Sequence, residues 1–93
     1  METKTVTKEE LKNYHFVHHD VLHNHEERQE RELHLHEAVR LGNEHKTKVE
    51  LICETTEGTI AVETTVWAFT DNHIELKSGF DIPVKAIKEV VIF

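Results

Sequence analysis

The residues with the most evident capacity for chemistry are histidines, of which this chain of 93 residues has nine. His15, His19 and His23 are spaced four residues apart, which would place them within about 80° of one another on a helix. Glu26 would continue the same row. Histidine nitrogens and carboxylate oxygens bind zinc, and two histidines one helical turn apart can reach the same ion. The row suggests a zinc or nickel site, completed by Glu26 or by a second subunit.

The same histidines have a plainer interpretation, which we favour. The row would lie beside the apolar stripe of an amphipathic helix, where polar residues are commonly solvated and bind no ligand. Eight of the nine histidines precede Lys46, and they are scattered along this half of the chain rather than gathered in one motif. Metal binding is therefore the alternative function and not the first one.

A helix is expected to position this row. Thr7 followed three residues later by Glu10 is a capping-box pattern, which predicts a helix over residues 8–23. Its apolar face would be formed by Leu11, Tyr14, Val17, Val21 and Leu22.

Residues 25–41 allow two interpretations. Asn24 followed by Glu27 is a second possible capping box, and it predicts a second helix that Gly42 would end. Apolar residues at positions 33, 35, 39 and 41 also follow the alternation of a strand, which would lead into a hairpin loop at Gly42-Asn43. We prefer the helix because Leu, Ala, Glu and Arg have high helix propensities.

The second half of the chain is rich in Val, Ile and Thr and shows the alternation typical of strands. Glu57-Gly58 predicts a turn, and Pro83 should end a strand because it has no amide hydrogen to donate. The expected strands cover residues 48–55, 59–69, 73–77, 80–82 and 88–93, with one helical turn over residues 84–87. The expected core is Val49, Leu51, Cys53, Ile60, Val62, Val66, Ala68, Ile74, Leu76, Ile82, Val84, Ile87, Val90 and Ile92.

Three large apolar residues fall on the opposite face of this pattern. If Val66 and Ala68 face the core, Trp67 and Phe69 point away from it, and Ile52 likewise opposes the inward face of its own strand. We expect such a second apolar face to be shielded from solvent by another part of the chain or by a partner. The N-terminal helix could supply that cover, or the three residues could form a surface for a dimer or a protein partner.

Composition and charge exclude several classes of protein. The formal net charge of -7 argues against nonspecific binding to nucleic acid or to anionic lipid, because both need a cationic surface. No apolar run approaches the roughly 18 residues of a membrane helix, and residues 1–4 show no apolar signal-peptide region. We therefore expect a cytoplasmic protein.

An enzymatic function is not expected. The sequence has no G-x-S-x-G, P-loop or H-E-x-x-H motif. Its one cysteine, Cys53, lies on the inward face of an expected strand, where it would act as a small buried apolar residue rather than a nucleophile.

The order of elements over residues 46–93, preceded by a helix, resembles Sm-like and SH3-like small barrels. Glu57-Gly58 and Ile82-Pro83-Val84 are the segments that carry the likeness, and residues 62–68 together with Ile82-Pro83-Val84 are also similar to short bacterial proteins of no assigned function. In acidic charge and outline the chain resembles the Rho-binding antiterminator proteins. That resemblance implies a small barrel that binds a protein partner.

Together these features predict one α+β domain, with helices packed on a five-stranded antiparallel Sm-like or SH3-like barrel. Residues 1–6 would be a disordered terminus, residues 7–42 a histidine-rich helical segment and residues 43–93 the barrel. We expect a non-enzymatic module without a cofactor that binds a protein partner or itself. A homo-oligomer is expected because small domains gain stability by association. An Sm-like ring that binds RNA is the third hypothesis, and the negative charge disfavours it.

Overall fold

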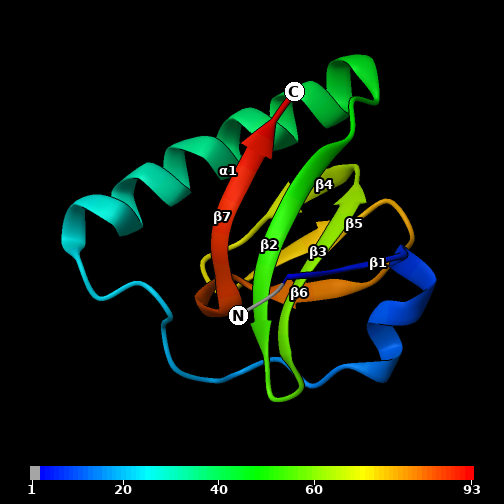
Figure 1. Ribbon diagram of the computed structural model, residues 1–93. Helices are drawn as coiled ribbons and strands as arrows, with labels where there is room; N and C mark the ends of the chain where they lie inside the picture. Colours follow the sequence, from blue (N-terminus) through cyan, green and yellow to red (C-terminus); the bar gives the residue numbers. More distant parts are fainter. Residues whose placement is uncertain (1–2) are drawn as a thin grey trace.

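The computed structural model describes residues 3–93 (Figure 1). It contains one long helix, two short 3-10 helices and seven strands. In chain order these are β1 Lys4–Val6, η1 Lys8–Asn13, α1 His25–His45, β2 Val49–Thr55, β3 Gly58–Thr64, β4 Val66–Phe69, β5 His73–Leu76, β6 Asp81–Pro83, η2 Val84–Ala86 and β7 Ile87–Ile92.

The larger sheet has four strands in the order β1-β3-β2-β7. β2 and β3 form an antiparallel hairpin around Gly58, whose φ of 119° is readily adopted only by glycine. β7 pairs with the other edge of β2, and β1 lies parallel to β3 with Thr5 opposite Ala61. The prediction of a disordered terminus is thus wrong for residues 4–6, while residues 1–2 lie outside the described part.

The smaller sheet has three strands in the order β4-β5-β6. The strand expected over residues 59–69 is divided at Thr65, so that β3 belongs to one sheet and β4 to the other. The α+β class is confirmed, but the strands within residues 3–93 form two open sheets and not a closed five-stranded barrel. Pro83 is the last residue of β6, and a single 3-10 turn leads into β7, both as expected.

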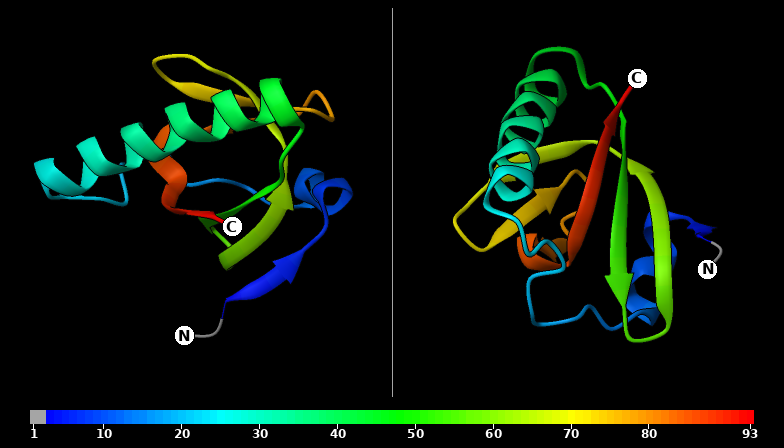
Figure 2. Two further views of the ribbon diagram at one scale, coloured as in Figure 1. Left: turned by 90° about the horizontal axis from the view of Figure 1, so that it is seen from above. Right: turned by 60° about the vertical axis from the view of Figure 1, so that its left-hand side comes forward.

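Helix α1 lies across one end of the molecule and contacts both β4 and β7 (Figure 2). The helical interpretation of residues 25–41 is confirmed, and the Asn24 side chain accepts hydrogen bonds from the backbone N–H groups of Glu26 and Glu27. Gly42 does not end the helix. A Cβ at this position would collide with the Val66 carbonyl oxygen, so glycine permits close contact between α1 and β4.

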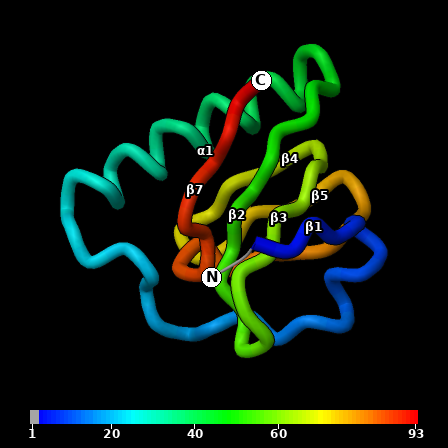
Figure 3. The backbone as a smooth tube through the Cα atoms, in the orientation of Figure 1, coloured from blue at the N-terminus to red at the C-terminus, as the bar shows by residue number. Residues whose placement is uncertain are grey.

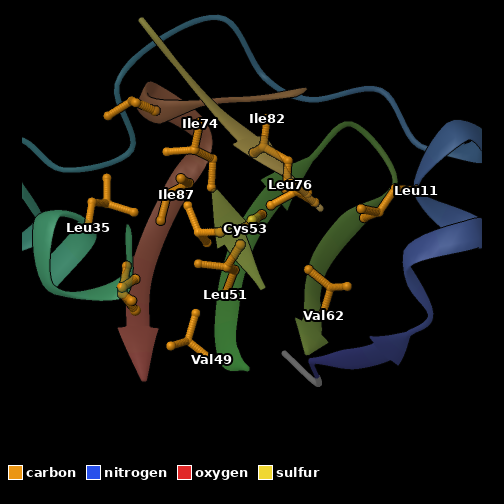
Figure 4. Packing of buried hydrophobic residues seen from close by; sticks show 14 of the residues in the cluster. Leu11, Leu35, Val49, Leu51, Cys53, Val62, Ile74, Leu76, Ile82 and Ile87 are labelled. Atoms are coloured by element: carbon orange, nitrogen blue, oxygen red, sulfur yellow. The ribbon is translucent and has the colours of Figure 1, made fainter. Parts of the chain in front are cut away.

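The core fills the space between the two sheets and α1 (Figure 4). Alternate residues of β2 face inward and are fully buried, as predicted for Val49, Leu51 and Cys53. Ala68 and Ile92, also predicted for the core, are only half-buried. The prediction missed Val6, Leu11, Leu22, Leu35, Ala38, Ala61 and Ala86, all of them buried.

The helix expected over residues 8–23 is present only as the 3-10 helix η1, and the chain from residue 14 to residue 24 then forms neither a helix nor a named strand (Figure 3). We call residues 14–24 the extended segment, because they are drawn out along the rest of the molecule instead of being coiled. The backbone of this segment forms hydrogen bonds with β2, with the β2–β3 turn and with η2, all of them distant in sequence. His15 O accepts from Thr56 N at 2.7 Å, Val17 N donates to Glu54 O at 3.3 Å, and Val21 N donates to Lys85 O at 3.0 Å. These long-range bonds satisfy the peptide groups that a helix would have paired locally.

Candidate binding surface

The predicted histidine row is not formed, because the helix that should carry it is absent. His15, His19 and His23 lie on the extended segment, whereas Glu26 lies in the first turn of α1. Within residues 3–93, no group of three or more His, Cys, Asp or Glu side chains is placed so that it could hold a metal ion. The zinc or nickel hypothesis loses the geometry on which it depended.

His15 instead contacts the β2–β3 turn. Its backbone N–H donates to Glu57 Oε1 at 2.9 Å, and its ring Nδ1 lies 3.0 Å from Glu57 Oε2. The backbone hydrogen bond from His15, with further hydrogen bonds from the Thr56 hydroxyl and the His15 ring, lowers the pKa of Glu57 to about 2. This contact holds the extended segment against the hairpin.

The predicted interaction surface of Trp67, Phe69 and Ile52 is also divided. The pairing of β4 with β5 shifts register between Val66 and Ala68, which inserts Trp67 as an extra residue. Phe69 then lies opposite Ile74, on the core side, and its ring stacks on His36 of α1 with centroids 4.8 Å apart. Trp67 remains 44% exposed.

Ile52 lies on a different sheet, on the outer face of β2. The three residues therefore do not form one surface. The N-terminal segment does not cover Phe69 either, since that role belongs to α1. Simple alternation cannot predict this arrangement, because one inserted residue reverses the faces of everything after it.

The outer face of the larger sheet carries an unusual set of carboxylates. Glu50 on β2 lies directly opposite Glu63 on β3, and like charges at directly opposed positions destabilise a sheet. Glu54 lies further along β2, and Glu89 on β7 lies opposite Ile52. We call this surface the acidic face, comprising Glu50, Glu54, Glu63 and Glu89 around Ile52, Ala61 and Val91.

None of the four acidic-face carboxylates takes part in an ion pair within the described part of the chain. Glu54 accepts a hydrogen bond from the Thr59 hydroxyl. Ile52 and Val91 are half-buried, whereas Glu63 and Glu89 are exposed. The face therefore combines accessible apolar surface with carboxylates that form no ion pair with any described lysine or arginine.

Two grooves adjoin β7. One, of about 600 Å³, lies on the acidic face between Ile52 and the extended segment, and His19 and His23 line its far side. The other, of about 360 Å³, lies between β7 and the N-terminal half of α1. Lys88 and Glu89 line both grooves, so the acidic face continues around the edge of the sheet.

A partly buried ion pair fixes the second groove. The Arg31 guanidinium donates to both carboxylate oxygens of Asp20 at 2.9 Å, and its Nη1 also donates to Ile87 O at 3.0 Å. Arg28 Nε donates to Leu22 O at 2.7 Å. Burial alone would raise the pKa of Asp20, but the hydrogen bonds from Arg31 and from the Leu22 N–H outweigh burial and lower it. Arg31 thereby joins α1, the extended segment and β7.

Cys53 is buried on the inward face of β2, and burial raises the pKa of its thiol to about 12. At neutral pH the group is a protonated thiol without access to solvent, which is the state of a packing residue rather than a nucleophile.

One feature of the sequence indicates the acidic face, and it is the predicted turn rather than the alternation of the strands. A turn at Glu57-Gly58 implies a hairpin register, and the register places Glu50 opposite Glu63. No comparable signal exists for the Arg31–Asp20 pair, because it depends on an extended segment where a helix was expected.

Comparison with known proteins finds no matching family model, no matching curated protein and no matching solved structure. None of the helices within residues 3–93 has the combination of length and apolar character that crossing a membrane requires.

Proposed function

We propose that this protein is a non-enzymatic interaction module that binds a basic segment of a protein partner on its acidic face. The observation that carries the proposal is the opposed pair Glu50 and Glu63, which lies beside the half-buried side chain of Ile52. The pair costs stability in the isolated domain. Lysine or arginine side chains of a partner would remove that repulsion, and apolar side chains between them would cover Ile52.

Charge favours a basic partner over a second copy of the chain. The formal net charge is -7, so a second copy would bring further negative charge to a surface that already has an excess. A basic partner would instead approach faster and be held by complementary charge.

The Sm-like or SH3-like relationship also remains a proposal. It is supported by the order of the elements, in which the β2–β3 hairpin is followed by β4, β5 and β6, and a 3-10 turn leads into β7 paired with β2. The likeness to acidic antiterminator proteins agrees with a protein partner rather than RNA.

The test uses a fluorescent ten-residue peptide of alternating lysine and valine, with binding measured by anisotropy. The variant E50Q/E63Q should bind about fivefold more weakly, because the charge contacts of one half-buried and one exposed carboxylate are lost. The matched control is E9Q/E75Q, which removes the same net charge from exposed positions outside the acidic face.

Equal weakening in both double variants would show that only net charge matters, and absence of any peptide binding would also refute the proposal. A labelled RNA oligonucleotide that bound more tightly than the peptide would favour the RNA hypothesis.

A further inference from the structure

We infer that the basic segment binds as an added strand along the free edge of β7. This inference rests on the proposed function. Glu50 and Glu63 lie on β2 and β3, inside the sheet, so one extended stretch of the partner pairs with the edge of β7 while the adjoining stretch lies over the acidic face. Within residues 3–93, β7 pairs with β2 alone and forms one edge of the four-stranded sheet. An extended peptide can hydrogen-bond to such an edge, while its alternate side chains enter pockets on either side.

β7 is the better of the two edges for this role. It has six residues, whereas β1 at the opposite edge has three and is followed after one residue by η1. A register shift next to Cys53 leaves Lys88 as an extra residue near the start of β7. From Glu89 to Ile92 the pairing with β2 is regular, which leaves a straight length of edge for an incoming strand.

Helix α1 forms the wall of the groove that faces the edge of β7. The 360 Å³ groove between α1 and β7 has the buried side chains of Leu22 and Val90 among its lining residues. Arg31 donates to Ile87 O, so the first carbonyl of β7 is already satisfied, and an added strand would pair beyond it. Small apolar side chains of the added strand fit toward Leu22 and Val90.

The charges along this groove favour lysine or arginine on the other face of the added strand. Glu27 and Glu30 line it from α1, and Glu89 lines it from β7. Arg31 is already paired with Asp20. The lining then has one further lysine or arginine, Lys88, beside the three carboxylates. His34 is the remaining titratable residue of the lining.

The experiment compares the alternating lysine–valine peptide with the same peptide carrying N-methyl groups on all of its backbone amides. Both have the same charge and side chains, but the methylated one lacks the amide hydrogens that pair with an edge. The unmodified peptide should bind about tenfold more tightly, since the methylated one loses several hydrogen bonds. The unmodified peptide should also slow hydrogen exchange of the amides in residues 89–92.

A second readout uses E27Q/E30Q, which removes the α1 wall of charge without touching the acidic face. This variant should bind the unmodified peptide about fivefold more weakly, while E9Q/E75Q again serves as the control. Circular dichroism verifies that each variant is folded.

The outcomes separate the two proposals. If both peptides bind equally and only E50Q/E63Q weakens them, the partner lies over the sheet face, so strand addition is overturned and the proposed function stands. If neither peptide binds the wild-type protein, the proposed function fails and the added strand fails with it.

Discussion

Residues 3–24 and residues 25–93 are held in place by different kinds of contact. The later region packs through apolar side chains, with Leu35, Leu51 and Ile87 fully buried between α1 and the sheets. The earlier region has three buried apolar anchors, Val6, Leu11 and Leu22. It otherwise depends on backbone hydrogen bonds and ion pairs to distant elements. An apolar stripe alone therefore does not determine a helix when the surrounding sheets offer better partners for the backbone.

The largest effect should come from the apolar region. Leu35→Ala removes a fully buried side chain of α1 and should lower the free energy of unfolding by about 3 kcal/mol. Leu33→Ala is the matched control on the same helix, since Leu33 is 68% exposed and its loss should change stability little. Urea denaturation measures both. Equal destabilisation by the two variants would contradict the packing of α1 through Leu35.

Gly42→Ala tests the contact between α1 and β4. The added Cβ would meet the Val66 carbonyl oxygen, so α1 must move, at a cost of about 2 kcal/mol despite alanine's higher helix propensity. The exposed neighbour Glu44→Ala is the control. Thermal unfolding measures the stability of both variants. A Gly42→Ala protein more stable than wild type would show that α1 does not approach β4 so closely.

Asp20→Asn tests the polar region. It leaves the buried Arg31 guanidinium without its carboxylate, which should cost about 2 kcal/mol. Hydrogen exchange should rise first at Val21 and Leu22, and Asp71→Asn in an exposed turn should leave it unchanged. Because the folded-state pKa of Asp20 is lowered, its contribution is present above the ordinary aspartate pKa of about 4 and is lost as the pH falls through the folded value. Unchanged exchange at these residues in Asp20→Asn would argue against the ion pair as their anchor.

Glu57→Gln should have the smallest effect, confined to the contact between His15 and the β2–β3 turn. The pKa of Glu57 is lowered to about 2, so this contact is maintained above pH 4.5 and is lost as the pH falls toward 2. Exchange of the His15 amide should follow that acid transition in the wild type. In Glu57→Gln the transition should be absent, and its persistence would assign it to another carboxylate.

The sequence predicted best where each element's own pattern decides its structure. The alternation of Val49, Leu51 and Cys53 was sufficient for β2, and the Asn24 cap for the start of α1. It failed at Thr65 and Trp67, where a break and an inserted residue depend on how two sheets meet. Prediction from the sequence failed again in the extended segment, because the hydrogen-bonding partners of its backbone are distant in the chain.

The candidate binding surface could likewise be predicted from the sequence only in part. Glu50, Glu54 and Glu63 sit on predicted strands and could have been placed from the hairpin register, whereas Glu89 could not, because β7 pairs with β2 across a register shift. The groove beside β7 could not, because its shape depends on Arg31 bridging three elements.

The parallel pairing of β1 with β3 has a consequence for synthesis of the chain. Lys4–Val6 leave the ribosome well before their partners Ile60–Val62 are made. β1 must therefore wait without its final pairing while α1 and the β2–β3 hairpin emerge, and it joins the sheet late. The charged and threonine side chains around Val6 lower the tendency of the nascent segment to aggregate before β3 is available for pairing.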